Sequence, residues 1–460
     1  MYDLIIIGGG AAGFAAATRA DDLGAKVLML NEGLPIGGTC VNVGCVPSKH
    51  LLAIAEAVHA ARSPRFTSVA PSREPAHSYG EAVREKDALV ESLRRRNYED
   101  VLASFRTVEF RRARARLVGP GRIRAGEEEF EARHVLVATG ARAAVPPIPG
   151  LAEAGFLTNV EALSLADAPE SLAVIGGGPL GLEFAQILKR FGSAVTVIEA
   201  EPEIVPRAEP EIAAVLRTAL EHEGIRFLTG TRIERVEPGP PHRLHCEGGV
   251  CVEAAAILVA TGIRPNTEGL GVESAGGELD PRGFVKAAPW LEAGERLWAA
   301  GDVVGRMPLE TVAAKEGALA ASNALEGRRD ALEYDGVPWA VFTSPQLAGV
   351  GFTEAESMAR TGYCNCRTVY YRQLPRALAA KDTVGAAKLT VDREGRIRGG
   401  YVCGTNAAEV IHEVAMAVRL GLTVRDIIDA VHVFPTYSEV VKFAALAFTR
   451  DVSVMTCCIG

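Results

Sequence analysis

The sequence has little of what a nucleic-acid-binding or disulfide-stapled protein needs. Its 460 residues carry a net charge of −8, so no basic excess is present to neutralise phosphates. Its nine cysteines are too few for a disulfide scaffold in a chain of this length, and their number is odd. We therefore expect no nucleic-acid partner, and a reducing, cytoplasmic environment in which any disulfide is catalytic.

Long apolar runs are equally scarce at the N-terminus. The run from residue 4 to residue 17 is interrupted by glycines, follows Asp3 rather than a basic segment, and ends at Thr18-Arg19. It fits neither a signal peptide nor a membrane span, so we expect no membrane partner. With 48% hydrophobic and 23% charged residues, the chain has the composition of a globular protein of several domains.

Two cysteines mark the stretch around which the chain is organised. Cys40 and Cys45 flank Gly44, which gives the backbone freedom to close a small disulfide ring or to turn two thiolates toward one partner. Pro47 suits the first position of a helix, so Cys45 should lie near a helix N-terminus, where the thiolate is favoured. Spacing alone supports a redox pair and a stapling disulfide equally.

A βαβ dinucleotide-binding unit precedes the cysteines. Residues 3–8 predict a buried strand, and residues 26–30 predict a second one after an alanine-rich helix. Between them, Gly8 allows the turn, Gly10 allows close approach of a pyrophosphate, and Gly13 allows the helix to pack on the strand.

The same unit recurs in the middle of the chain. Residues 172–175 and 194–198 predict the two strands, and Gly176, Gly178 and Gly181 supply the turn and the start of the helix. Because both copies keep all three glycines, we predict two bound nucleotides rather than one nucleotide and a decayed copy.

The residue after each second strand bears on which nucleotide binds. In the first unit, Asn31 or Glu32 can bond the adenosine ribose, and we favour Glu32. In the second unit, Glu199 should accept bonds from a ribose 2′-hydroxyl and repel a 2′-phosphate, so NADH is preferred over NADPH. Arg207 could weaken that preference, but we expect it in a solvated loop.

The remaining pattern sets the domain limits. The proline-rich residues 146–150 suit a connector between two domains. After about residue 335 the sequence becomes rich in predicted strands. We predict an α/β protein with two Rossmann-like dinucleotide-binding domains, for FAD and NAD(P)H, and a C-terminal α+β dimerisation domain. The predicted limits are 1–149 with 267–335 for the FAD domain, 150–266 for the NAD(P)H domain, and 336–460 for the interface domain.

With these residues assembled, the chain resembles the flavoprotein disulfide reductases, the group that contains glutathione reductase, dihydrolipoamide dehydrogenase and mercuric reductase. The resemblance implies FAD beside Cys45, NAD(P)H on the second fingerprint, and an ion pair between Lys49 and Glu183 near the flavin. It also implies a homodimer in which the interface domain of one subunit completes the active site of the other. Further cofactor-binding positions implied by the motifs are Gly38, Thr39, Thr139, Gly140, Gly262, Gly301 and Asp302.

The C-terminal third departs from the disulfide-reducing members. Their His-Pro-Thr-x-x-Glu segment supplies a histidine that acts as acid and base for a departing thiol. Here Phe434 takes the histidine position and cannot move a proton, while His432 lies two positions earlier and could substitute only with a shifted backbone. A metal ion held by thiolates needs no such proton, so the change favours a metal substrate.

The chain end points the same way. Adjacent Cα atoms lie about 3.8 Å apart, below the roughly 4.4 Å minimum of ordinary disulfides, so Cys457 and Cys458 should stay available for a soft metal. Their Cys-Cys-x-Gly terminus resembles that of mercuric reductases, in which Tyr437 would match a tyrosine lining the metal site. Pro179 replaces an aromatic residue that gates the nicotinamide pocket in many relatives. Because the flavin fingerprint begins at the first residues, we expect no metal-binding domain before it.

These features predict NAD(P)H-dependent reduction of Hg(II) to Hg(0). Cys457 and Cys458 of the partner subunit should capture Hg(II) and pass it to Cys40 and Cys45. The alternatives are a dihydrolipoamide dehydrogenase or related flavin disulfide reductase, and a non-catalytic, flavin-bound metal-sequestering protein. We assign no function to the remaining cysteines, which are Cys246, Cys251, Cys364, Cys366 and Cys403.

Overall fold

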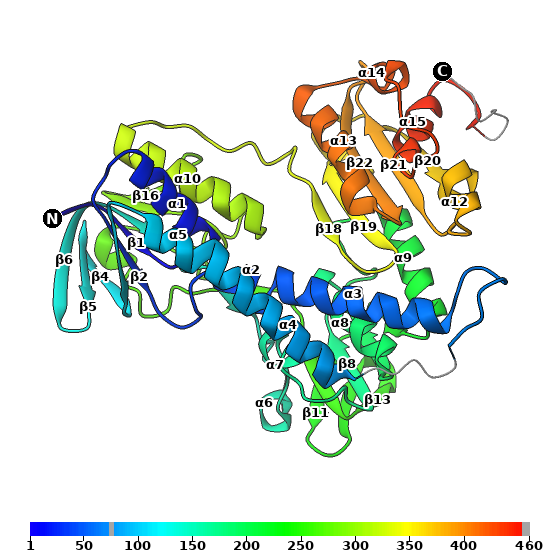
Figure 1. The fold of residues 1–460 in the computed structure, drawn as a ribbon, viewed down its shortest axis with the longest axis horizontal. Helices are drawn as coiled ribbons and strands as arrows, with labels where there is room; N and C mark the ends of the chain where they lie inside the picture. The colour runs from blue at the N-terminus through cyan, green and yellow to red at the C-terminus, as the bar shows by residue number, and fades with distance from the viewer. Residues whose placement is uncertain (73–77, 453–460) are drawn as a thin grey trace. The chain divides into compact units, whose positions relative to one another are not determined.

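The computed structural model describes residues 1–72 and 78–452, which divide into two compact units (Figure 1). Unit 1 comprises residues 1–48, 84–144 and 262–334. Unit 2 comprises residues 49–83, 145–261 and the chain from Asp335 onward. Both unit 1 and unit 2 are therefore assembled from segments that are far apart in the sequence.

Unit 1 is built on a mostly parallel sheet. Its strands run in the order β16-β17-β6-β1-β2-β3, and only β16 is antiparallel to its neighbour. The bounds are β1 Tyr2–Ile7, β2 Val27–Asn31, β3 Val108–Arg112, β6 Glu128–Val137, β16 Glu292–Gly294 and β17 Leu297–Ala299. Shorter strands extend this unit: β4 Ala115–Gly119, β5 Arg122–Ala125, β7 Ala141–Ala143 and β15 Ile263–Pro265.

Both faces of this sheet are buried, which explains the unbroken apolar run in β1. Leu4 and Ile6 belong to the hydrophobic cluster that contains residues of helices α1 (Ala11–Asp22) and α10 (Glu310–Glu326), whereas Ile5 and Ile7 belong to the cluster on the opposite side. Gly317 lets α10 lie directly against α1, because a Cβ there would overlap the backbone of Ala12.

Helices form most of the described residues between β2 and β3. They are α2 Gly38–Val43, α3 Cys45–Arg62, α4 Tyr79–Arg94, the π-helical turn η1 Arg95–Glu99, and α5 Asp100–Ser104. α3 ends at Arg62 and the next helix, α4, begins at Tyr79.

The middle part of unit 2 repeats the parallel arrangement. Its sheet has the order β10-β9-β8-β14, with bounds β8 Ser171–Ile175, β9 Ala194–Ile198, β10 Arg226–Leu228 and β14 Ala256–Val259. The helices of this part are α6 Leu151–Ala154, α7 Asn159–Ala162, α8 Pro179–Arg190 and α9 Pro210–His222. A separate antiparallel sheet contains β11 Ile233–Glu237, β12 His242–Cys246 and β13 Cys251–Ala254, and β12 and β13 form a hairpin.

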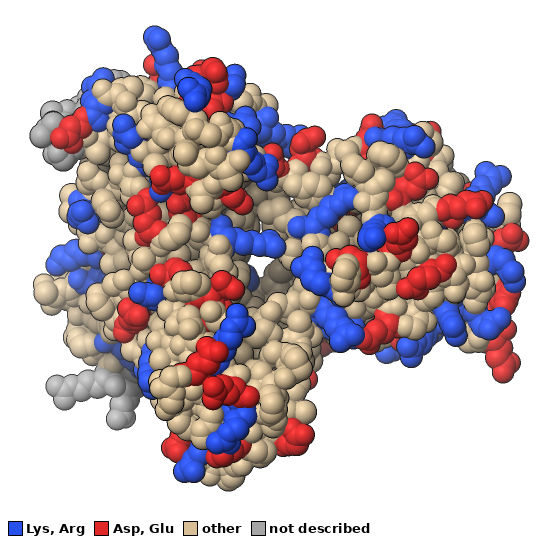
Figure 2. Space-filling model, turned by 180° about the vertical axis from the view of Figure 1, so that it is seen from behind, with Lys and Arg blue, Asp and Glu red and all other residues tan. Residues whose placement is uncertain are grey.

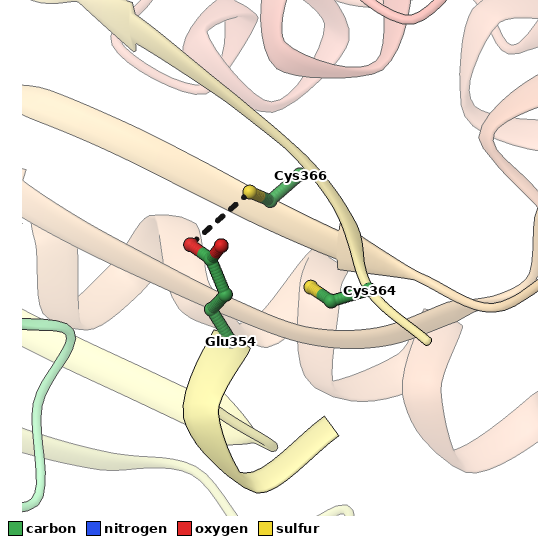
Figure 3. Close-up of side chains that lie close together, drawn as sticks. All are labelled: Glu354, Cys364 and Cys366. Atoms are coloured by element: carbon green, nitrogen blue, oxygen red, sulfur yellow. Dashed lines mark hydrogen bonds between the residues drawn. The ribbon is translucent and has the colours of Figure 1, made fainter. Parts of the chain in front are cut away.

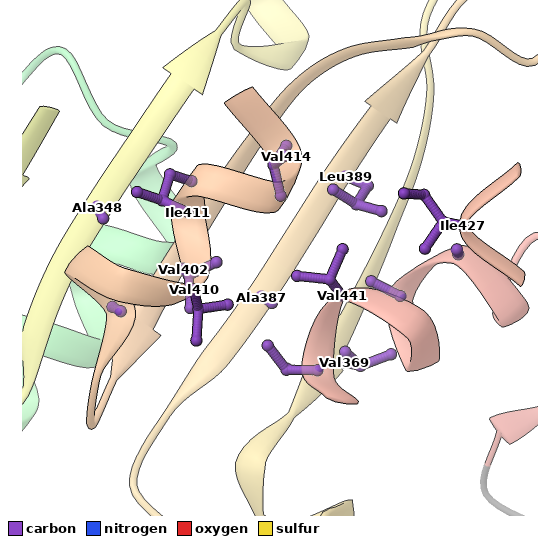
Figure 4. Close-up of a cluster of buried hydrophobic side chains, with 14 of the residues drawn as sticks. Ala348, Val369, Ala387, Leu389, Val402, Val410, Ile411, Val414, Ile427 and Val441 are labelled. Carbon is purple, nitrogen blue, oxygen red and sulfur yellow. The ribbon is translucent and has the colours of Figure 1, made fainter. Parts of the chain in front are cut away.

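The C-terminal part of unit 2 is an antiparallel sheet covered by helices, as the predicted α+β domain requires. The strand order is β18-β19-β22-β21-β20, with bounds β18 Trp339–Val341, β19 Gln346–Gly351, β20 Asn365–Tyr370, β21 Ala386–Val391 and β22 Ile397–Gly404. The helices are α11 Glu354–Thr361, α12 Pro375–Ala379, α13 Ala407–Leu420, α14 Val424–Asp429 and α15 Glu439–Leu446. Ile411 and Val441 are among the helical residues that meet Leu389 and other strand residues in the core (Figure 4).

Acidic and basic side chains are interspersed on the face of the molecule shown in Figure 2, as the modest net charge of −8 leads one to expect. Among residues 1–72 and 78–452, no helix is long and apolar enough to cross a membrane.

Candidate active site

The first fingerprint forms a tight turn from β1 into α1. Gly8 has φ +119°, and a Cβ there would overlap the carbonyl oxygen of Ala138. A Cβ on Gly13 would overlap the carbonyl oxygen of Gly8, so the helix can lie this close only with glycine. α1 starts directly after Gly10 and has no acidic residue in its first turn, which leaves its N-terminus suited to a phosphate.

The cysteine-bearing stretch begins against this fingerprint. The amide of Gly37 donates to the carbonyl of Gly9 at 2.8 Å, and a Cβ on Gly38 would lie 2.7 Å from the Cα of Gly10. Thr39 follows and is exposed. A nucleotide bound at the N-terminus of α1 would therefore lie beside the start of α2.

Two further strand ends meet at the same edge of the sheet. β6 leads into Thr139 and Gly140, and β17 leads into Gly301 and Asp302, while β6 lies between β17 and β1. Burial raises the pKa of Asp302. Because parallel strands end at one edge, these turns surround the fingerprint, where open α/β sheets bind their ligands.

Glu316 on α10 supports this edge and has no counterpart among the predicted residues. Its Oε2 accepts from the amide of Gly301 at 2.7 Å, and the side chain is 1% exposed. Burial raises the pKa of Glu316. Elsewhere in unit 1, the amide of Ala144 donates to the carbonyl of Gly262 at 2.9 Å.

Asn31, rather than Glu32, lies against the first fingerprint. The Asn31 side-chain oxygen accepts from the amide of Gly9 at 2.9 Å, and its nitrogen donates to the carbonyl of Leu34 at 3.0 Å. Glu32 is exposed, with its carboxylate 3.8 Å from Arg114. The choice of Glu32 as the ribose ligand stays a prediction.

The second fingerprint has the same construction. Gly176 has φ +112°, and its missing Cβ would overlap the carbonyl of Ala260, just as a Cβ on Gly181 would overlap the carbonyl of Gly176. Gly178 precedes α8, whose first residue is Pro179 and whose first turn has no acidic residue. The second helix N-terminus is thus equally suited to a phosphate.

Glu199 matches Asn31 in position. Its Oε2 accepts from the amide of Gly177 at 2.6 Å, and its Oε1 accepts from the amide of Glu201 at 2.8 Å. Arg207 is exposed, as expected. The acceptor after the second strand is therefore a carboxylate in one fingerprint and a neutral amide in the other.

The cysteine pair spans the end of one helix and the start of the next. Cys40 lies within α2 and is half-buried, whereas Cys45 is the first residue of α3 and is exposed. The prediction that Cys45 lies at a helix N-terminus is confirmed. Gly44 separates the helices, and a Cβ on it would lie 2.8 Å from the carbonyl oxygen of Thr39.

Asn42 and Ser48 hold the backbone around the cysteines. The Asn42 amide nitrogen donates to the carbonyls of Gly38 at 2.8 Å and Pro35 at 3.1 Å. The Ser48 hydroxyl donates to the carbonyl of Gly44 at 2.8 Å. These bonds restrict where the two sulfur atoms can lie.

Tyr98 is a neighbour of this stretch that sequence reasoning missed. A Cβ on Gly37 would lie 3.0 Å from the Tyr98 ring, and that ring packs edge-on against Phe14 with centroids 5.0 Å apart. Burial, together with the negative charge of Cys40 and Cys45, raises the pKa of Tyr98 to about 12. Tyr98 lies in the π-helical turn η1, a geometry frequent at functional sites.

The expected ion pair of Lys49 with Glu183 forms within unit 2. The ammonium lies 2.7 Å and 2.9 Å from the two carboxylate oxygens, and Glu183 is only 3% exposed. Glu183 also accepts from the amide of Phe342 at 3.1 Å, and the ammonium lies 4.8 Å above that phenyl ring. Lys49 follows Cys45 by four residues in α3.

Phe434 and His432 differ in their surroundings. Phe434 is 53% exposed, and no proton-transferring group occupies its position. The His432 Nε2 lies 2.8 Å from a carboxylate oxygen of Glu413, and this hydrogen bond raises the pKa of His432. The motif glutamate, Glu439, instead accepts from the backbone amide of Thr436 at 3.1 Å.

Tyr437 is buried in the C-terminal part of unit 2. Its hydroxyl donates to Asp382 at 3.0 Å, and its ring stacks on Tyr371 with centroids 5.5 Å apart. Arg65 forms an ion pair with Asp382 at 2.8 Å. Cys457 and Cys458 lie outside the described residues.

Known proteins similar to this chain include mercuric reductases, a dihydrolipoyl dehydrogenase and a flavoprotein disulfide reductase. A mercuric reductase from Streptomyces lividans is 39% identical over 473 residues, covering 100% of this chain and 98% of that protein. A dihydrolipoyl dehydrogenase from Thermus scotoductus is 38% identical over 465 residues, covering 98% of each. The solved structure of the HOCl-induced flavoprotein disulfide reductase RclA from Escherichia coli has a TM-score of 0.87 at 27% identity, covering 98% of this chain and 100% of that one.

Family models account for nearly the whole chain. Residues 2–317 match the pyridine nucleotide-disulphide oxidoreductases, and residues 337–445 match the dimerisation domain of the same group, which supports a homodimer. The two glycine fingerprints and the C-terminal α+β domain are the parts that this architecture requires. The chain therefore belongs to the pyridine nucleotide-disulphide oxidoreductases, flavoproteins that depend on FAD and NAD(P)H.

Proposed function

We propose that this chain catalyses the NAD(P)H-dependent reduction of Hg(II) to Hg(0). The observation that carries the proposal is Phe434, which stands where disulfide-reducing relatives have an acid–base histidine. A phenyl group cannot protonate a departing thiol, whereas a metal ion leaving two thiolates needs no proton from the protein. The similarity to mercuric reductases over the full chain supports the proposal.

The fingerprints assign the cofactors. We place FAD on the first fingerprint, with the turns at Thr139-Gly140 and Gly301-Asp302 and the Gly38-Thr39 stretch around it, and NAD(P)H on the second fingerprint. Bound flavin supplies a two-electron relay between the nicotinamide and the cysteine pair. The corresponding domain limits are 1–149 with 267–335 for FAD, 150–266 for NAD(P)H, and 336–460 for the interface.

Glu199 selects the nicotinamide cofactor in this proposal. Its carboxylate is held by two backbone amides at 2.6 Å and 2.8 Å, so it cannot swing far from the second fingerprint. A 2′-phosphate beside it would meet like charge, whereas a ribose 2′-hydroxyl could donate to it. NADH is therefore the preferred donor.

Lys49 is held by its ion pair. Glu183 binds it through both carboxylate oxygens and so limits its rotamers. Cys45 is the first residue of α3, and the field of the helix N-terminus favours a thiolate at that sulfur. Cys40 then serves as the outer thiol that exchanges with the incoming complex.

Transfer of mercury uses four sulfurs. Cys457 and Cys458 of the partner subunit capture Hg(II) from its thiol complex, and Cys40 and Cys45 take the ion over in a homodimer whose active site is shared. Two electrons, equivalent to one hydride from NADH, convert Hg(II) to Hg(0), and both metal–sulfur bonds break. Tyr437 as a residue lining this path stays a prediction.

A dihydrolipoamide dehydrogenase or related disulfide reductase is the second candidate, and the His432–Glu413 pair favours it. A histidine held by a carboxylate at 2.8 Å, with a raised pKa, has the properties of an acid–base catalyst. If His432 protonated the departing thiol, His432→Gln would lower lipoamide turnover and leave mercury turnover unchanged. A metal-sequestering protein would bind Hg(II) without mercury-dependent NADH oxidation.

The mercury hand-off can be tested with the variant Cys457→Ser/Cys458→Ser. We expect turnover of thiol-complexed Hg(II) to fall by at least about tenfold, a loss of about 1.4 kcal/mol in transition-state stabilisation. Flavin reduction by NADH should be unchanged. Cys251→Ser, which removes another exposed thiol, is the matched control. Unaltered mercury turnover in the double variant would refute the hand-off.

A further inference from the structure

A second group of sulfur ligands lies in the C-terminal part of unit 2. The sulfur atoms of Cys364 and Cys366 and a carboxylate oxygen of Glu354 all lie within 4.8 Å of one another (Figure 3). The Cys366 thiol donates to Glu354 Oε2 at 3.3 Å. None of the roles proposed above uses these three residues.

Strand geometry explains why the two sulfurs meet. Cys366 is in β20 and Cys364 lies one residue before that strand, so residues two apart present their side chains on the same face. Glu354 begins α11, which Thr353 caps by accepting from the amide of Glu356. Figure 3 shows the carboxylate and both thiols pointing into the same space from these two elements.

The surroundings carry an excess of negative charge. Lys388 on β21 lies 2.8 Å from Glu354, 3.1 Å from Glu209 and 3.1 Å from Glu211. One ammonium thus faces three carboxylates, and its contact fixes the orientation of the Glu354 carboxylate. Outer partners of this kind orient the ligands of metal sites. These ion pairs explain why the three carboxylates lie close to one another. They do not explain why the sulfurs of Cys364 and Cys366 lie beside Glu354.

The two thiols need not be ionised before a metal ion arrives. A soft cation displaces thiol protons as it binds.

We propose that Cys364, Cys366 and Glu354 form a binding site for one thiophilic d10 cation, of the class that contains Zn(II), Cd(II) and Hg(II). Two sulfurs and one carboxylate supply three ligands, and a water completes a four-coordinate shell. Binding exchanges two S–H bonds for two metal–sulfur bonds and releases two protons. The site goes beyond the reduction of Hg(II) and does not require it, because no electron transfer is involved.

The test uses the full-length, FAD-loaded protein carrying Cys40→Ser, Cys45→Ser, Cys457→Ser and Cys458→Ser, so that the proposed mercury path is removed. Cd(II) is the probe, because it is thiophilic and is not reduced by the protein. Anaerobic titration in the presence of a phosphine reductant, followed by equilibrium dialysis and by cadmium–thiolate absorption in the ultraviolet, should give one bound Cd(II) per chain.

Variants of the proposed ligands should then remove this binding. Cys364→Ser/Cys366→Ser should abolish the bound equivalent, and Glu354→Gln should weaken it by about 10- to 100-fold. Cys251→Ser, in the same background, should bind as before. The same Cd(II) stoichiometry and affinity after removal of both sulfurs would overturn the proposal.

Alkylation mapping keeps the test valid if the double serine variant fails to fold. In the four-serine background with both sulfurs present, Cd(II) should slow iodoacetamide labelling of Cys364 and Cys366 and leave the labelling of exposed Cys251 unchanged, as read by peptide mass spectrometry. Labelling of Cys364 and Cys366 at the same rate with and without Cd(II) would contradict the site.

Discussion

The Lys49–Glu183 pair allows a quantitative prediction. Lys49→Met removes the ammonium and leaves the Glu183 carboxylate, which is 3% exposed, without its cation. Of the hydrogen bonds described for Glu183, the one from the Phe342 amide at 3.1 Å then stays. Breaking a buried ion pair by removing one partner costs about 3–5 kcal/mol. The side chain of Lys49 is 32% exposed, so water can replace part of the lost contact, and we expect a cost of about 2 kcal/mol.

Removing both charges should recover most of that loss. In Lys49→Met/Glu183→Leu no charge stays buried, and the Phe342 ring, which lies 4.8 Å from the ammonium, already offers an apolar surface. We therefore expect a coupling energy of about 1–2 kcal/mol between the two sites. Lys442→Met, a half-buried lysine on α15, is the matched control.

The assay should be local, because the unfolding of a chain with several domains is not two-state. Hydrogen exchange of the Phe342 amide reports the pair directly, since this amide donates to Glu183. A cost of about 2 kcal/mol corresponds to exchange about 30-fold faster in Lys49→Met. Unchanged exchange in Lys49→Met, or strictly additive effects of the two substitutions, would refute the reasoning.

Three further changes test the fingerprints and the histidine. Gly13→Ala places a Cβ on the carbonyl oxygen of Gly8 and so disturbs the turn of the first fingerprint. The purified protein should then contain at most about a tenth of the normal FAD per chain, as measured from its absorption spectrum. Full flavin content would contradict the assignment of FAD to this fingerprint. Glu199→Ala should raise the ratio of kcat/KM for NADPH to that for NADH by about tenfold, and an unchanged ratio would remove Glu199 as the selector. Glu413→Gln should lower the pKa of His432, which an NMR titration measures; an unshifted pKa would show that Glu413 does not hold it. Because folding raises this pKa, the stability from the pair is present below about pH 6.5 and is lost as pH rises through the folded pKa.

The parallel sheets and the C-terminal domain could be predicted because local patterns determine them. A buried parallel strand needs apolar residues on both faces, so the run in β1 was informative without knowledge of its neighbours. Gly8 and Gly176 adopt the positive φ that their turns require, and Pro47 indicates the first turn of α3. The strand order of the C-terminal sheet depends on pairings distant in sequence, and no local pattern indicated it.

Residues brought together by distant contacts were the ones that sequence reasoning missed or left open. Asn31 rather than Glu32 faces the first fingerprint, because the last residue of β2 points back at the amide of Gly9. Tyr98 meets the cysteine-bearing stretch only because η1 folds beside Gly37. Nothing in the sequence linked Cys364 and Cys366 to Glu354, which α11 places next to them in the structure.

The most direct test of the central claim is anaerobic NADH oxidation by the purified, FAD-loaded protein, with thiol-complexed Hg(II), lipoamide and glutathione disulfide offered in parallel and volatile mercury recorded. The account predicts rapid oxidation with Hg(II) alone and one Hg(0) released per NADH, because each hydride carries two electrons. Rapid lipoamide or glutathione disulfide reduction without release of Hg(0) would contradict it in favour of a disulfide reductase.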